Sequence, residues 1–153
     1  MALLKGLLHY QKLSNNMNLT IYTDGGSLNN PGQAAYGFLI YNGKKQVYTQ
    51  NERIGIASNN VAEYTALIRA LEFVRDTIQK SKVPATGLSI ISDSLLMVNQ
   101  VNGLYKVKNV DIKPLHSKIK MLEMELGLPM SYKHVLRDKN TEADALVKEA
   151  LGK

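Results

Sequence analysis

Four acidic side chains of this 153-residue chain stand at the ends of predicted strands or the starts of predicted helices: Asp24, Glu63, Asp93 and Asp144. Four carboxylates within a few ångströms would repel one another and raise one another's pKa values. Divalent cations relieve that repulsion, and a ligand set made only of oxygen atoms selects Mg²⁺ or Mn²⁺. Two such ions roughly 3.5–4 Å apart can activate a water molecule and stabilise the leaving oxygen in phosphodiester hydrolysis.

Each acid also has a simpler interpretation. Asp24 could be a solvated hairpin residue, Glu63 a favourable charge in the first turn of a helix, and Asp93 a helix N-cap. Asp144 is flanked by apolar residues inside the last predicted helix, where a charge should cost stability unless something binds it. Strand ends and helix starts can converge at one edge of a sheet, so the four acids together favour a shared site.

The first of these acids follows a strand signal. Residues 20–23 are β-branched or aromatic, and the glycine-rich stretch 25–32 reads as a turn before a second alternating strand, residues 35–41. This pattern predicts a β-hairpin in which Asp24 ends the first strand and does not pair with the sheet. Asn42-Gly43 predicts a two-residue turn into a third strand over residues 44–54.

Helical periodicity and turn residues define the remaining elements. The segment Ser58-Asn59-Asn60 supplies an N-cap for the first predicted helix. The predicted helices cover residues 60–79, 94–101, 111–126 and 140–151, and the predicted strands between them cover 88–92 and 130–136. The order β-β-β-α-β-α-α-β-α predicts an α/β fold with a five-stranded mixed sheet flanked by helices.

Bulk composition bounds the class of protein. The length and the 44% hydrophobic and 21% charged residues fit one globular domain, taken as residues 19–151, with residues 1–18 as a dispensable extension. A net charge of +6 suits a polyanionic partner such as nucleic acid. Zero cysteines exclude disulfides, thiolate zinc sites and a cysteine nucleophile, and fit a cytoplasmic location. No run approaches the roughly 20 apolar residues of a membrane span, so no membrane partner is expected.

Four sequence blocks, in order along the chain, carry a family resemblance. They are Tyr22-Thr23-Asp24-Gly25-Gly26-Ser27 with Asn30-Pro31-Gly32, Ser58-Asn59-Asn60-Val61-Ala62-Glu63, Ser92-Asp93-Ser94, and Asn140-Thr141-Glu142-Ala143-Asp144-Ala145-Leu146. With them the chain resembles the type 1 ribonucleases H, on the reverse-transcriptase-like side of that family. The resemblance spans residues 19–150.

The resemblance implies a ribonuclease H-like fold and a metal-dependent endonuclease. The enzyme would cut the RNA strand of RNA–DNA hybrids by a two-metal-ion mechanism, leaving 5′-phosphate and 3′-hydroxyl ends, with Mg²⁺ as cofactor and Mn²⁺ as substitute. Asp24, Glu63, Asp93 and Asp144 would be the catalytic metal ligands. A monomer with no obligate protein partner is expected. Two alternatives stay open: a nuclease of the same fold that also accepts double-stranded RNA, and a non-catalytic nucleic-acid-binding module.

The resemblance also assigns substrate contacts. Asn30, Asn59 and Asn60 match family positions that touch the minor groove of the hybrid, where RNA displays its 2′-hydroxyls. Ser58 matches a position that helps seat a DNA phosphate, and Gly25 and Ser27 complete the substrate-binding set. Helix capping is the simpler interpretation of the two adjacent asparagines.

The chain departs from many relatives in two places. The segment 103–109 is too short for the basic helix and loop that grip the substrate in bacterial relatives, and offers only Lys106 and Lys108. The loop 136–140 lacks the histidine that many relatives carry there. His134 is the nearest histidine, and its place in a strand pattern predicts a structural role.

The extension yields a direct prediction. Every matched motif follows Leu19, so a chain that begins at Met17 should fold and keep its activity. Circular dichroism and hybrid cleavage would check this. Insolubility or inactivity would instead mean that the leucines near the N-terminus pack on the core or on a partner.

Overall fold

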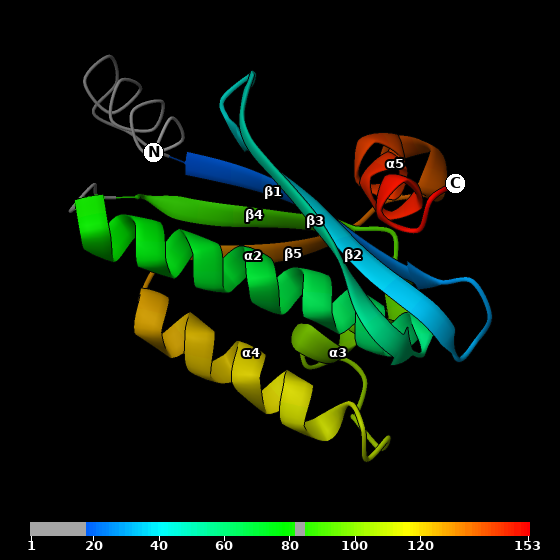
Figure 1. Ribbon diagram of the computed structural model, residues 1–153. Coiled ribbons are helices and arrows are strands. Elements are labelled where there is room, and N and C mark those ends of the chain that lie inside the picture. Colours follow the sequence, from blue (N-terminus) through cyan, green and yellow to red (C-terminus); the bar gives the residue numbers. More distant parts are fainter. Residues whose placement is uncertain (1–17, 82–84) are drawn as a thin grey trace.

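The structure is a computed structural model that describes residues 18–81 and 85–153. Residues 1–17 of the expected extension lie outside the described residues, and its last residue, Asn18, is the first residue of β1. The described residues form a five-stranded sheet in the order β3-β2-β1-β4-β5 (Figure 1). The strands are β1 (Asn18–Ser27), β2 (Gly32–Asn42), β3 (Lys45–Ala57), β4 (Gly87–Ser92) and β5 (Met130–His134).

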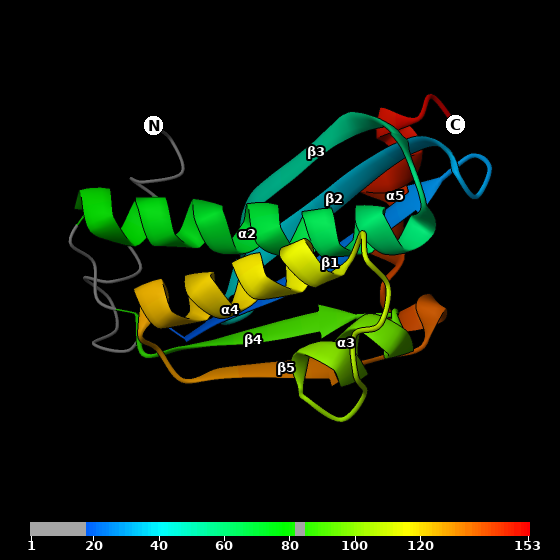
Figure 2. The same cartoon turned by 90° about the horizontal axis from the view of Figure 1, so that it is seen from below.

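The sheet is mixed, as the order of elements predicts. Strand β1 is antiparallel to β2 and parallel to β4, while β2 is antiparallel to β3 and β4 is parallel to β5. Helices α2 (Asn59–Ser81) and α4 (Lys113–Leu126) cover one face of the sheet, and α5 (Thr141–Ala150) covers part of the other (Figures 1 and 2). Helix α3 (Leu95–Val101) and the short 3₁₀ helix η1 (Arg137–Lys139) complete the chain. The predicted α/β architecture is therefore confirmed.

The main core lies between the sheet and α2. Alternate residues of β1, among them Leu19 and Ile21, point to this side, and Leu67 and Leu71 of α2 meet them. Helix α4 adds the fully buried Ile119. Among the described helices, none has the length and apolar character needed to cross a bilayer.

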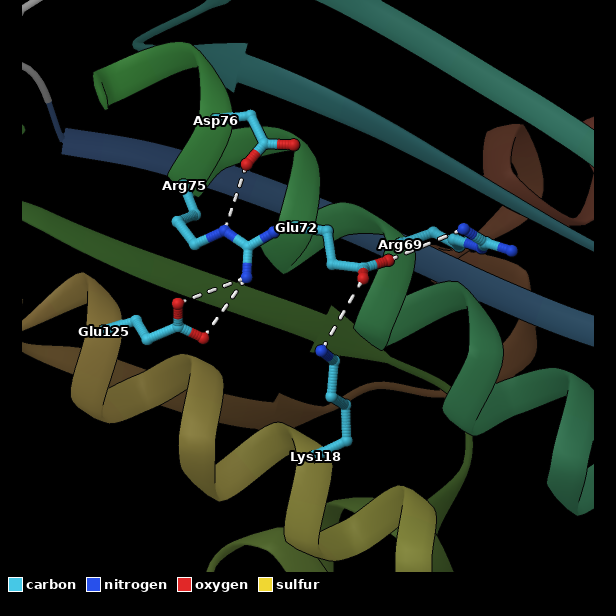
Figure 3. Close-up of polar contacts among 6 residues, drawn as sticks. All are labelled: Arg69, Glu72, Arg75, Asp76, Lys118 and Glu125. Carbon is cyan, nitrogen blue, oxygen red and sulfur yellow. Dashed lines mark hydrogen bonds and ion pairs between the residues drawn. The ribbon is translucent and has the colours of Figure 1, made fainter. Parts of the chain in front are cut away.

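Ion pairs span the outer side of the α2–α4 contact (Figure 3). The Nη1 atom of Arg75 lies 3.2 Å from Oε1 of Glu125, and Nζ of Lys118 lies 3.9 Å from Oε2 of Glu72. Such exposed pairs stabilise by about 0–1 kcal/mol each, less than one buried leucine. The apolar side chains beneath them therefore hold α4 in place, and the ion pairs favour one alignment of the two helices.

The first hairpin differs from its prediction. Strand β1 continues through Asp24, which pairs with Gly37 of β2, to Ser27, and only residues 28–31 form the connection. The glycines 25 and 26 therefore lie in a strand and not in a turn. The reason at Gly25 is steric, because a Cβ atom there would stand 2.2 Å from the backbone carbonyl carbon of Ala62 in α2.

Other boundaries shift by small amounts. Strand β3 extends to Ala57, three residues beyond its prediction, while β5 ends at His134 and α4 begins two residues late at Lys113, with Pro114 in its first turn. The second hairpin turn is centred on Gly43-Lys44, one residue later than predicted, because Asn42 still pairs with Lys45. Gly43 has a φ of 64°, which a glycine adopts without strain.

The close approach at Gly25 predicts a sharp contrast between two neighbouring glycines. Gly25→Ala should lower the free energy of unfolding by about 3 kcal/mol or more, because β1 and α2 would have to separate. Gly26→Ala is the matched control, since its Cβ would meet Val147 at an ordinary 3.7 Å, and it should change stability by less than about 1 kcal/mol. Chemical denaturation of both variants tests the contrast, and equal effects would contradict it.

Candidate functional site

Three of the four predicted acids lie close together, where α2 packs against β1 and the C-terminal end of β4. Asp24 lies in β1, Glu63 in the second turn of α2, and Asp93 directly after β4. Each offers one carboxylate oxygen, and these three oxygens all lie within 4.8 Å of one another. Asp24 and Glu63 are each only 7% exposed, so two of the three carboxylates are removed from water.

The register of the sheet and the N-cap of α2 place these residues. Parallel pairing brings Thr23 of β1 opposite Ser92 of β4, so the residues that follow them, Asp24 and Asp93, lie at one edge. Ser58 caps α2, because its Oγ accepts a hydrogen bond from the Val61 N–H at 3.2 Å. Helix α2 then turns Glu63 toward β1, where the Gly25 N–H donates to its Oε1 at 2.6 Å.

Two of the simpler interpretations are wrong. Helix α3 is capped by Ser94, whose side chain accepts from the Met97 N–H, and not by Asp93. Glu63 lies beyond the first turn of α2, where the field of the helix terminus falls off, so a helix-start charge does not explain it.

Asp144 stands apart from the three converging acids. It lies in the first turn of α5, and its Oδ2 is 2.9 Å from the Nζ of Lys148, one turn later. Its side chain is 29% exposed, so the expected cost of a charge inside an apolar face is offset by this ion pair and by water. Its charge still raises the pKa values of Asp24 and Asp93.

Helix α5 is held against the sheet by side chains of both partners. The buried Asn140 amide donates to the Thr23 carbonyl at 2.9 Å, and the Tyr41 hydroxyl donates to Glu142 at 3.0 Å. At the other end, Nε of Arg53 donates to the Ala150 carbonyl at 2.7 Å. These contacts place Asp144 across from Asp24. Asn140 belongs to the fourth matched block, but its role in holding α5 has no local sequence signal, because its partner Thr23 lies 117 positions away.

Burial dominates the electrostatics of the carboxylates. It raises the pKa of Asp24 from 3.8 to about 7, and the charges of Asp93 and Asp144 add to the rise. Burial also raises the pKa of Glu63 well above its usual value, helped by the charge of Asp24 and by a hydrogen bond between the two carboxyl groups. Burial raises the pKa of Asp93 as well, and Arg137 opposes this from 3.8 Å. The cluster therefore holds protons near neutral pH unless another cation replaces them.

A cavity of about 420 Å³ opens over these side chains. All four acids line it, together with cationic and polar residues from α2, η1 and the end of the chain. Its cationic lining residues are Arg137, Lys148 and Lys153. An all-oxygen set of buried carboxylates beside cations is suited to divalent metal ions and to the phosphates of a polyanion.

The predicted substrate residues lie along the same cavity and its rim. Gly25, Ser27, Asn59 and Asn60 line it, while Asn30 accepts a hydrogen bond from Asn59 and Ser58 caps α2. The Asn59 Oδ1 accepts from both the N–H and the hydroxyl of Ser27 at 2.9 Å, and the Asn59 N–H donates to the Asn30 side chain at 3.0 Å. The two asparagines therefore do not cap α2, and the exposed Asn60 amide has no hydrogen-bond partner among the described residues.

Two other basic residues, Lys148 and His134, lie near the acids, and only the first has a sequence signal for its contact. Lys148 follows Asp144 by four residues, the spacing of a helical ion pair, and this signal was available but unused. His134 is the last residue of β5 and pairs in register with Ser92, and a positive charge on it lowers the pKa of Asp93. Its predicted position in a strand is confirmed, but its nearness to Asp93 was not foreseen.

The chain matches the sequence model of a known protein family. The model of the family described as RNase H matches residues 16–151. A bifunctional protein of Mycobacterium tuberculosis is 36% identical over 137 residues, which cover 88% of this chain and 36% of that protein. The chain thus spans about a third of the length of the first curated relatives that it matches. Ribonuclease HI of Halobacterium salinarum is 35% identical over 132 residues, 85% of this chain and 62% of the relative.

Solved structures agree in fold. The crystal structure of LC11-RNase H1 in complex with an RNA/DNA hybrid superposes with a TM-score of 0.82 at 38% identity, covering 88% of this chain and 96% of that one. The RNase H1 of Halobacterium salinarum superposes with a TM-score of 0.80 at 34% identity, covering 88% and 98%.

The raised carboxylate pKa values predict how stability depends on pH. The unfolded chain releases the Asp24 proton near pH 3.8 and the folded chain near pH 7, so Asp24 lowers the free energy of unfolding progressively across that range. In EDTA, Asp24→Asn should therefore become more stable relative to the unsubstituted chain as pH rises from about 4 to about 7. Urea denaturation at several pH values measures the difference. The exposed Asp111→Asn is the control, and a parallel trend in it would contradict the assignment.

Proposed function

Because the chain belongs to the RNase H family as a type 1 member, we propose that it is an endonuclease that hydrolyses the RNA strand of RNA–DNA hybrids. The observation that supports this most directly is the buried group of Asp24, Glu63 and Asp93, with Asp144 on the same cavity. The products would carry 5′-phosphate and 3′-hydroxyl ends. A protein that bound hybrids without cutting them would have no need of three mutually repelling carboxylates.

Divalent metal ions fit this donor set. Four carboxylates supply only oxygen ligands, and burial raises the pKa values of three of them, with repulsion between the neighbouring acids adding to the rise. Asp24, Glu63, Asp93 and Asp144 would hold the ions, with Mg²⁺ as the proposed cofactor and Mn²⁺ as its substitute. When bound, such ions activate water and stabilise the charge that develops on the leaving oxygen.

The remaining groups of the cavity would bind and orient the substrate. The amide of Asn60 is free to exchange hydrogen bonds with 2′-hydroxyls and base edges of a wide minor groove, and Asn59 fixes the adjacent loop through Ser27. Arg137, 88% exposed, can reach a phosphate while it faces Asp93. The Ser92 hydroxyl, which donates to Glu63 and accepts from the Ser94 N–H, keeps the Glu63 carboxyl oriented.

We also propose that a single chain is the active unit and that the protein is cytoplasmic. The absence of cysteine in the sequence supports the second of these.

Cleavage of matched labelled duplexes tests the proposal. RNA–DNA, RNA–RNA and DNA–DNA duplexes of one sequence would be incubated with the full chain in Mg²⁺, Mn²⁺ or EDTA. We expect cleavage of only the RNA strand of the hybrid, and only with metal. Cleavage of the RNA–RNA duplex at a similar rate would favour the broader nuclease, and hybrid binding without cleavage of any duplex would favour the binding module.

Asp93→Asn isolates the role of the acids. The substitution keeps the shape of the side chain and removes one metal ligand, so turnover should fall by about a hundredfold or more while thermal stability stays equal or rises. Product analysis on gels and a thermal melt in EDTA measure both. The control Asp111→Asn changes an exposed acid outside the cavity and should keep full activity. Full activity of the Asp93 variant would remove it from the site.

A further inference from the structure

Asp144 and Lys148 form a contact that the proposed hydrolysis leaves unexplained. The other three acids lie with their oxygens within 4.8 Å of one another, and Asp144 does not share that group. Its Oδ2 is instead 2.9 Å from the Lys148 ammonium, and both side chains line the cavity that the other acids line. The close partner of Asp144 is thus a lysine ammonium and not another carboxylate of the cavity.

We propose that Lys148 is an internal counter-ion that holds Asp144 until a divalent cation displaces it. This inference rests on the proposed function, because it takes the four acids as the metal site. In the metal-free chain the ammonium neutralises the charge of Asp144, and the carboxyl groups of the other three acids remain close together. Metal binding that recruits Asp144 must break the ion pair, so Lys148 weakens the affinity for the ion.

The position of the pair makes the exchange feasible. Asp144 is 29% exposed and Lys148 is 58% exposed, so water screens the pair and the ammonium can leave it at little cost. Asp24 and Glu63, by contrast, are nearly buried and are fixed by hydrogen bonds from Gly25. Of the four carboxylates, Asp144 is the most exposed and has the closest cation. Lys148 therefore controls whether Asp144 can approach a metal ion.

A simpler role for Lys148 is the stabilisation of α5 by an ordinary pair at four-residue spacing. Both roles predict some loss of stability for Lys148→Gln, and they differ in the metal affinity that they predict. A helix-stabilising pair would make the variant less stable with unchanged metal affinity. A counter-ion would make the metal-free variant slightly less stable while metal binding becomes tighter.

The test is a metal titration without substrate. The full chain, freed of metal with EDTA and dialysed, would be titrated with MgCl₂ and separately MnCl₂ at fixed ionic strength, by calorimetry and by the metal-induced rise in melting temperature. We expect Lys148→Gln to bind the ion roughly two- to fivefold more tightly than the unsubstituted chain, the scale of an exposed ion pair. Lys148→Arg, which keeps the cation, should bind like the unsubstituted chain.

Lys153→Gln is the matched control. Lys153 lines the same cavity but has no ion pair to a carboxylate among the described residues, so this variant removes one charge without releasing Asp144. It should tighten metal binding by less than half of the effect of Lys148→Gln.

Three outcomes would overturn the inference: unchanged or weaker metal affinity in Lys148→Gln, an equal gain in Lys153→Gln, or a gain in Lys148→Arg as large as in the glutamine variant. In the first two, hybrid cleavage by the unsubstituted chain would leave the proposed function standing. A chain that neither binds metal nor cuts hybrids would overturn both.

Discussion

The backbones of α2 and β1 approach each other so closely at Gly25 that no side chain fits between them, and the geometry of the site depends on this contact. It lets the Gly25 N–H reach the Glu63 carboxylate at 2.6 Å and sets Glu63 beside Asp24. Core packing by Leu67 and Leu71 farther along α2 maintains the approach. The glycine is thus a packing requirement, and the arrangement of the two buried acids is its consequence.

The contact has an electrostatic cost that the fold carries without metal. Two carboxyl groups that are each nearly buried share a hydrogen bond, and burial drives the pKa of both upward. Ion pairs elsewhere do not offset this, since exposed pairs such as Arg75 with Glu125 stabilise by less than about 1 kcal/mol. The apolar core must therefore supply the free energy that offsets this cost. A divalent cation that bound only the folded chain would add to its stability.

Much of the fold could be predicted because periodicity and turn chemistry act locally. The order of strands and helices followed from such signals. The exact end of β1 could not be predicted. A glycine in a strand that lets a helix pack closely against it looks the same in the sequence as a glycine in a turn. The four acids were found from their positions relative to strands and helices. Long-range contacts such as Asn140 with Thr23 and Tyr41 with Glu142 were not, because they exist only after the chain folds.

Exposure rises across the four acids, and this gradient separates their structural roles. Asp24 and Glu63 form a fixed floor that the sheet and α2 hold, while Asp93 follows β4 and faces a flexible arginine side chain across 3.8 Å. Asp144 lies at the rim, on a helix pinned at both ends but with a side chain that water and Lys148 can reach. If these acids hold cations as proposed, the rigid floor would fix where the cations gather, and the exposed rim would let the ligand set change. The proposed site would thus combine two firmly placed buried acids with one acid that water and a lysine already reach.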